Sequence, residues 1–199
     1  MSTIGVTEDF YRKIKPRLHK RIGRELRLAG RVLDLGCGSC DLVKYLARSY
    51  GQVVTGVDVS GGSFPRRRQT KEGRRFRCVR KNARYLAFLK DASVDAVVST
   101  LAFHEMSHPQ AILAEAHRVL RPGGELLIVD FPRGSIAQEL WNEDYYTPQK
   151  LTRMVADSDF AEVQAKSIER GQIMWIRGYR PSAEAGTRSS FSECKQRSR

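Results

Sequence analysis

Short apolar runs alternate with stretches of helical periodicity along most of the chain. A strand is predicted where aliphatic and β-branched residues run together, and a helix where apolar residues recur three or four positions apart. By these criteria strands are expected at residues 31–35, 52–59, 75–80, 94–100 and 125–131, and helices at 8–28, 41–50, 109–120 and 147–158. Residues 62–73 are polar and contain Pro65, so any helix there is short.

Two further strands, 161–168 and 172–179, are separated by a tight turn at Arg170-Gly171. Because parallel neighbours need a long crossover, this closing pair is expected to be antiparallel. The strand–helix alternation before it is typical of an α/β fold. We therefore predict a Rossmann-like, doubly wound, mostly parallel seven-stranded sheet with an antiparallel last strand and helices on both faces.

The pattern divides the chain into three parts. Residues 1–29 form a helical extension, residues 30–180 the α/β domain, and residues 181–199 a Ser-, Arg- and Glu-rich tail that is predicted to be disordered. The Pro122-Gly123-Gly124 sequence is expected to stop the helix before it. The connection 132–146 is longer than usual, and connections of that length are often functional.

Charge is unevenly distributed along the chain. Of 199 residues, 35 are Lys or Arg and 22 are Asp or Glu, which gives a formal net charge of +13. The basic residues gather in segments 1–31, 61–84 and 177–199, so the remaining, most apolar part is net acidic. The basic segments are either solvated faces or a surface for RNA or an acidic metabolite.

Composition also bears on compartment and on cysteine chemistry. No stretch reaches the ~20 apolar residues of a membrane span, and the first fifteen residues lack the apolar core of a signal peptide. The four cysteines are too few and too unevenly spaced for a disulfide framework: Cys37, Cys40, Cys78 and Cys194. No second pair accompanies Cys37-x-x-Cys40, so neither metal nor redox chemistry is expected, and the chain is assigned to the reducing cytoplasm.

The sharpest motif is Val32-Leu33-Asp34-Leu35-Gly36-Cys37-Gly38-Ser39-Cys40, in which a strand runs into glycines ahead of a helix. Ligands of doubly wound sheets lie outside the carboxyl ends of the strands, where this loop belongs. Asp58 ends the next strand, at the position of an acid that binds ribose hydroxyls. Because the third glycine of a dinucleotide fingerprint is absent and the loop is acidic, the motif favours a cationic, adenosine-bearing ligand over a pyrophosphate.

These residues closely resemble the class I S-adenosylmethionine-dependent methyltransferases, in the branch of small-molecule and quinone-biosynthesis enzymes. The family's glycine motif corresponds to residues 34–38, and its ribose-binding acid to Asp58. Residues 94–99 resemble the family's fourth-strand motif, and residues 119–126 its helix-end and fifth-strand motif. The resemblance covers roughly residues 30–131.

The resemblance implies S-adenosylmethionine as cofactor and S-adenosylhomocysteine as its product. Gly36 and Gly38 are implied to pass under the methionine part, Asp34 to hold its amino group, and Asp58 to accept both ribose hydroxyls. The implied cofactor residues are Asp34, Gly36, Cys37, Gly38, Asp58, Val59, Asn82, Ala83 and Leu101. Two residues depart from the family pattern: Cys40 stands where the last glycine is usual, and Asn82 where Asp is common.

The acceptor is expected beside Ala102-Phe103-His104-Glu105-Met106, which follows the fourth strand. His104 is the candidate general base, and Glu105 either orients it or contacts the substrate. The alternative is that His104 packs against the cofactor or caps a turn, since many relatives methylate without a base. Aromatic residues of the first helix and the long loop either form a lid over an apolar acceptor or pack ordinarily: Phe10, Tyr11, Trp141, Tyr145 and Tyr146.

We therefore predict an enzyme that moves a methyl group to a small-molecule acceptor by in-line displacement, with residues 1–29 as a helical lid. Two alternatives stand beside it: an RNA-directed methyltransferase that uses the basic segments, and a non-catalytic cofactor-binding partner subunit. The protein is expected to be a monomer or homodimer with no metal.

Overall fold

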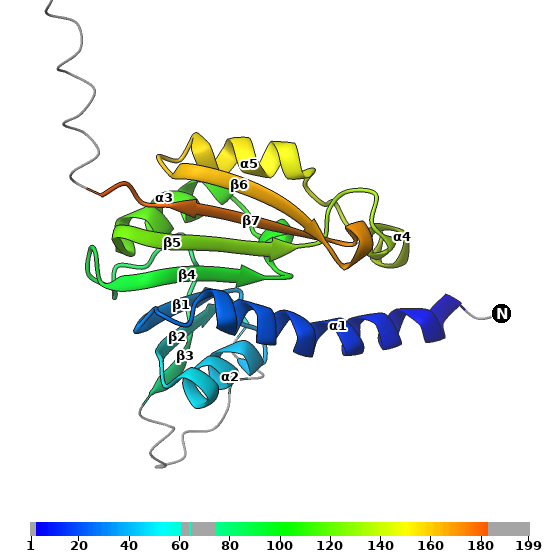
Figure 1. The fold of residues 1–199 in the computed structure, drawn as a ribbon, viewed down its shortest axis with the longest axis horizontal. Coiled ribbons are helices and arrows are strands. Elements are labelled where there is room, and N and C mark those ends of the chain that lie inside the picture. The colour runs from blue at the N-terminus through cyan, green and yellow to red at the C-terminus, as the bar shows by residue number, and fades with distance from the viewer. Residues whose placement is uncertain (1–2, 61–63, 65–74, 183–199) are drawn as a thin grey trace, which may run out of the picture.

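Seven strands form a single sheet in the order β3-β2-β1-β4-β5-β7-β6 in the computed structural model, which describes residues 3–60, 64 and 75–182 (Figure 1). The strands are β1 (Arg31–Leu35), β2 (Val53–Asp58), β3 (Phe76–Arg80), β4 (Val94–Thr100), β5 (Leu120–Asp130), β6 (Ala161–Ile168) and β7 (Ile173–Tyr179). Only β7 is antiparallel to its neighbours β5 and β6, and the other pairs are parallel. The predicted fold class is confirmed.

Five α-helices and two short 3-10 turns accompany the strands in the part of the chain that the structure describes. They are α1 (Thr3–Glu25), α2 (Asp41–Tyr50), η2 (Phe103–Glu105), α3 (Pro109–Val119), α4 (Ile136–Trp141), α5 (Pro148–Ala156) and η3 (Glu169–Gly171). None of the helices in the described part of the chain is long and apolar enough to cross a membrane.

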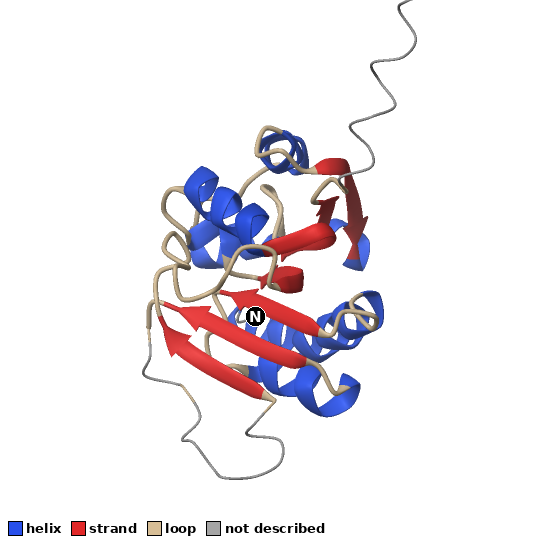
Figure 2. Ribbon diagram, turned by 90° about the vertical axis from the view of Figure 1, so that its left-hand side faces the viewer, coloured by secondary structure: helices blue, strands red, loops and turns tan. Residues whose placement is uncertain are grey.

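Helices cover both faces of the sheet because strand residues alternate between the two faces (Figure 2). Val32 packs with α1, α2 and α4 in one apolar cluster, whereas its neighbour Leu33 packs with α3 and α5 in the other. Helix α1 is held firmly on its side, since Ile14, Leu18 and Ile22 are each at most 2% exposed.

The order of the strands creates a switch point beside β1. The chain runs from β1 outward through β2 to β3, then returns to place β4 on the other side of β1. The helices that follow β1 and β4 pack on opposite faces of the sheet, and ligands of such sheets bind in the crevice at this edge. The glycine loop (residues 36–40) and the segment after β4 (residues 101–107) lie at this edge.

Two local predictions are wrong. Strand β5 begins at Leu120, so Pro122-Gly123-Gly124 lies inside a strand, at a register shift between β4 and β5, and does not separate helix from strand. Residues 136–141 form a helix inside the segment that we expected to be a long loop. Most of the expected short helix at 62–73 and most of the basic run there fall outside the described residues, as do residues 183–199 of the tail.

Candidate active site

The glycine loop turns sharply at the carboxyl end of β1. The N–H groups of Gly36 and Cys37 both donate to the carbonyl oxygen of Val57, at 2.8 and 3.1 Å, which ties the loop to the end of β2. Gly36 has a φ of +71°, and a Cβ there would lie 2.6 Å from the Cβ of Ala102. The position therefore requires glycine for conformation and for space.

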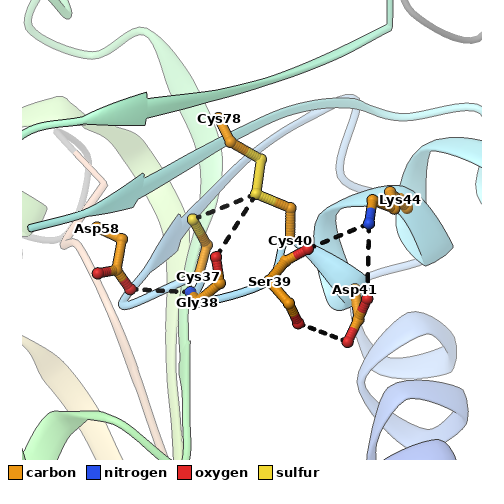
Figure 3. Close-up of a disulfide and its surroundings, with 8 residues drawn as sticks. All are labelled: Cys37, Gly38, Ser39, Cys40, Asp41, Lys44, Asp58 and Cys78. Carbon is orange, nitrogen blue, oxygen red and sulfur yellow. Dashed lines mark hydrogen bonds and ion pairs between the residues drawn. A yellow bond between two sulfur atoms is a disulfide. The ribbon is translucent and has the colours of Figure 1, made fainter. Parts of the chain in front are cut away.

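Asp58 lies against this loop from the end of β2 (Figure 3). Its Oδ2 accepts the N–H of Gly38 at 2.8 Å, and its Oδ1 accepts the N–H and hydroxyl of Ser60 at 2.8 and 3.0 Å. Each carboxylate oxygen has two lone pairs, and Oδ2 is left with one for a ligand hydroxyl. These hydrogen bonds fix the orientation of the Asp58 carboxylate and leave it able to accept a further hydrogen bond.

A cavity of about 170 Å³ opens between the loop, the end of β2 and the segment after β3. It is lined by Gly36, Val57, Asp58, Val59, Lys81, Asn82, Ala83, Ala102, Glu105, Met106, Ser107 and Ile112. Six of these were predicted from sequence: Gly36, Asp58, Val59, Asn82, Ala83 and Glu105. A larger hollow of about 480 Å³ lies between α3 and α5, but the glycine loop and Asp58 do not reach it. Because Gly36 and Asp58 line the smaller cavity, it is the candidate ligand site.

Asp34 is a buried carboxyl directly before the glycine turn. Its residue is 2% exposed, and its Oδ1 has no hydrogen-bond partner within the described ranges. Burial, and then the charge of Asp58, raise the pKa of Asp34 to about 8, against an opposing effect of Lys15. A buried, unpartnered carboxyl is costly unless a donor or a cation comes to it.

His104 is surrounded by the carboxyl groups of Asp130, Glu143 and Glu105 beside the cavity. Its Nδ1 is 2.8 Å from Oδ1 of Asp130, and its Nε2 is 3.0 Å from Oε2 of Glu143. Asp130 is fully buried at the end of β5 and also accepts the backbone N–H of His104 at 3.0 Å. Tyr145 donates its hydroxyl to Glu143 at 2.8 Å. Glu105, which lines the cavity, is 3.7 Å from Nε2 of His104.

Two carboxylates therefore face the two nitrogens of one imidazole, and both nitrogens need a proton to donate. Burial lowers the pKa of His104, but Asp130 through its hydrogen bond and charge, with Glu143 and Glu105, raises it above the ordinary value overall. The two carboxylates therefore favour the protonated form of His104.

The remaining predicted residues divide between this cluster and ordinary packing. Tyr145 belongs to the cluster, with its ring centroid 4.3 Å from that of His104. Trp141 packs on Phe131, and Tyr146 packs near Phe103. Leu101 is half-buried after β4 with a φ of 53°, and Cys37 and Gly38 form the glycine loop itself. Tyr11 lies in α1, but its side chain is outside the described part.

Sequence reasoning missed Asp130 and Glu143. Asp130 carried a readable signal, because an acid at the carboxyl end of a strand beside β4 belongs to the edge where ligands bind. Glu143 carried none, since its contact with His104 joins residues 39 apart through α4. Lys81 and Met106 were also missed as cavity residues, although both adjoin predicted ones.

The cysteines contradict one prediction. Cys40 and Cys78 form a disulfide, so the expectation that the cysteines are not linked by disulfides is wrong for this pair. The free Cys37 lies beside it, with its Sγ 3.8 Å from that of Cys40 (Figure 3). The three sulfur atoms lie within 4.8 Å of one another, but two of them form the disulfide and offer no thiolate to a metal. Ligand atoms of His104, Glu105 and Glu143 also lie within 4.8 Å of one another, so this group has metal-ligand spacing.

Comparison with known proteins gives a consistent family. Residues 33–128 match a family model described as a methyltransferase domain. The phthiotriol/phenolphthiotriol dimycocerosates methyltransferase 1 of Mycobacterium ulcerans is 37% identical, over 64% of this chain and 47% of that protein. A demethylmenaquinone methyltransferase of Tropheryma whipplei is 33% identical, over 69% and 58%. An uncharacterized methyltransferase of Mycobacterium tuberculosis is 33% identical, over 72% of this chain and 68% of that protein.

A solved structure has the same fold. The 1,6-didemethyltoxoflavin-N1-methyltransferase of Burkholderia thailandensis, with bound S-adenosylhomocysteine, superposes with a TM-score of 0.60 at 20% identity, over 82% of this chain and 78% of that one. The chain spans about half the length of the first curated relatives that it matches.

Proposed function

Since this chain belongs to the methyltransferase domain family, we propose that it transfers a methyl group from S-adenosylmethionine to a small-molecule acceptor. One observation carries the proposal. Two acids flank the glycine turn: Asp34 is buried, with an Oδ1 that has no hydrogen-bond partner among the described residues, and Asp58 is held by backbone N–H donors. The space that a Cβ of Gly36 would need is filled by Ala102 and Met106 from the segment after β4.

The residues present fit this cofactor. A sulfonium and an ammonium group are cationic, and the buried Oδ1 of Asp34 has no hydrogen-bond partner within the described residues. Asp58 retains an acceptor lone pair on Oδ2 for a ribose hydroxyl. Ala83 is small and 7% exposed, and Asn82 lies beside it in the lining of the cavity, where adenine would pack. The side chain of Asn82 also accepts the N–H of Arg84 at 3.0 Å, which fixes its orientation.

When bound, the cofactor supplies a methyl group that is already activated on sulfur. The task of the protein is placement: the acceptor atom, the methyl carbon and the sulfur must lie nearly in line with water excluded. Gly36 and Ala102 bring the loop after β1 and the segment after β4 close together, which sets the floor of the site. Met106 adds an apolar wall to the same cavity.

His104 is assigned as the group that takes a proton from an acceptor O–H or N–H. Asp130 holds Nδ1 in its protonated form and fixes the ring, so Nε2 is the nitrogen that exchanges protons: it becomes a base once the proton that it shares with Glu143 has left. Glu143 covers Nε2 in this structure and its side chain is 44% exposed, so an acceptor that enters from solvent must displace it to reach Nε2. Glu105 lines the cavity beside His104 and is assigned as a residue that contacts the substrate.

A small molecule is the favoured acceptor because the names of the relatives refer to small acceptors, including a quinone precursor. Helix α1 and the segment around α4 are assigned as the cover of the acceptor site, with Tyr145 as the aromatic residue beside His104. A cytoplasmic location and a monomeric or homodimeric state stay predictions from sequence.

Isothermal titration calorimetry with S-adenosylmethionine and S-adenosylhomocysteine tests the proposal. We expect one site per chain for each ligand, with micromolar or tighter affinity. A folded protein that binds neither ligand would contradict the proposed function.

A further inference from the structure

The glycine loop ends at a cysteine that the proposed function does not explain. Cys40 precedes the first residue of α2 with a φ of 61°, a left-handed conformation that favours glycine. The residue is fully buried, its N–H donates to the carbonyl of Cys37 at 2.8 Å, and its carbonyl accepts the N–H of Lys44 at 3.0 Å. The side chain at this strained position forms a disulfide with Cys78, a bond that glycine cannot make.

That bond joins two segments that lead into the lining of the cofactor cavity, although neither cysteine lines the cavity itself. Cys78 lies in β3, opposite Gly56 of β2, whereas Cys40 belongs to the loop after β1 (Figure 3). Two residues past Cys78 the strand ends at Arg80, and the chain continues into Lys81, Asn82 and Ala83, which line the cavity. The N–H of Lys81 donates to the backbone carbonyl of Asp58 at 2.9 Å. The disulfide therefore fixes the segment that carries Gly36 to the segment that carries Asn82.

We propose that Cys40 and Cys78 form a reversible redox site coupled to the cofactor cavity, whose ligand is a dithiol reductant. The oxidised form holds the two segments at the spacing that the cofactor needs, and reduction loosens them. This inference rests on the proposed function for what occupies the cavity.

The burial of Cys40 and Cys78 indicates which of the two sulfur atoms the reductant attacks. Cys78 is half-buried and Cys40 is fully buried, so the thiolate of the reductant attacks Sγ of Cys78. A new S–S bond forms to Cys78, the Cys40–Cys78 bond breaks, and Cys40 leaves as a thiolate that takes a proton. The second thiol of the reductant then displaces Cys78 and closes its own disulfide, so two electrons pass from the dithiol to the protein disulfide.

Cys37 is close enough to compete for the bond but is held as a thiol. Its Sγ is 3.8 Å from that of Cys40, so exchange would move the disulfide to the Cys37–Cys40 pair. Burial, and then the charges of Asp34 and Asp58, raise the pKa of Cys37 well above the usual range of a thiol. Only the thiolate attacks a disulfide, so Cys37 remains free and Cys40–Cys78 remains the linked pair.

Coupling between two sites is reciprocal. If the disulfide raises cofactor affinity by preorganising the cavity, bound cofactor must make the disulfide harder to reduce by the same factor. We expect S-adenosylhomocysteine to bind the oxidised protein on the order of tenfold more tightly than the reduced protein. The ratio [GSH]²/[GSSG] at which half of the disulfide is reduced should shift by that factor when S-adenosylhomocysteine saturates the protein.

The experiment uses the full chain equilibrated in reduced and oxidised glutathione, in which two glutathione molecules take the place of the two thiols of the dithiol. Alkylation of the denatured protein, read by mass spectrometry, reports whether Cys40 and Cys78 are linked, and calorimetry reports the affinity for S-adenosylhomocysteine in each state. C78S should bind like the reduced wild type and lose the response. C40G removes the bond while relieving the left-handed residue, so it keeps the test valid if C78S fails to fold. C194S is the matched control and should keep the full response.

Three results would overturn the proposal. One is equal affinity for the ligand in both states, another is alkylation of Cys40 and Cys78 in excess oxidised glutathione, and the third is a zinc ion bound by the reduced protein and lost in C78S. Absence of ligand binding in both states, with an intact disulfide, would instead contradict the proposed function.

Discussion

Replacing Gly36 by alanine tests whether the glycine turn is fixed by conformation alone or also by the close approach of the segment after β4. Gly36 has a φ of +71°, and the added Cβ would lie 2.6 Å from the Cβ of Ala102 and 2.8 Å from Cε of Met106. The left-handed conformation costs alanine about 1–2 kcal/mol, and crowding of a packed site adds about 1–3 kcal/mol. We expect Gly36→Ala to lower the free energy of unfolding by roughly 2–5 kcal/mol.

Gly123 provides the matched control. Its φ is +76°, and a Cβ there would meet nothing within 4 Å. Gly123→Ala should therefore cost only the conformational part, about 1–2 kcal/mol. Urea denaturation followed by far-ultraviolet circular dichroism measures both variants against the wild type. Equal losses for the two variants would refute the crowding argument, and with it the claim that Ala102 and Met106 set the floor of the site.

Three other predictions concern single carboxyl groups. Asp58→Asn should weaken binding of S-adenosylhomocysteine by about 1–3 kcal/mol through lost charge-assisted hydrogen bonds, and calorimetry that finds unchanged affinity would refute the role of Asp58. Because the pKa of Asp34 is raised to about 8, a cationic ligand should displace close to one proton at pH 7; the calorimetric enthalpy should then depend on the ionisation enthalpy of the buffer, and that dependence should vanish in Asp34→Asn. The raised pKa of His104 means that its ion pair with Asp130 stabilises the fold fully below about pH 6.5, the unfolded pKa, and less as pH rises through the folded pKa. The stability lost in Asp130→Asn, about 2 kcal/mol at low pH, should therefore shrink as pH rises, and a loss that grew with pH would contradict this assignment.

The parts of the site that are contiguous in sequence could be predicted, since local chemistry determines them. Gly36 follows a buried strand and Asp58 ends the next one, so their places at the edge of the sheet depend on nothing distant. The fold class could be predicted for the same reason, because alternating periodicity fixes the order of strands and helices.

The contacts of His104 could not be predicted in full because they depend on packing between distant segments. Glu143 reaches His104 only because α4 folds residues 136–141 into a helix too short to carry a clear apolar period. The Cys40–Cys78 bond depends on the register that places Cys78 opposite Gly56, and a shift of one residue would turn Cys78 to the other face. The strand start at Leu120 was missed because Pro122 and Gly123 usually break structure, whereas here they lie in an irregular stretch of β5.

A crystal structure of the protein grown with S-adenosylhomocysteine tests the central claim most directly. We predict the ligand in the cavity between Gly36 and Asn82, with a ribose hydroxyl on Asp58 and its amino group near Asp34. A ligand bound elsewhere, for instance between α3 and α5, or an Asp58 that contacts only Gly38 and Ser60, would contradict it.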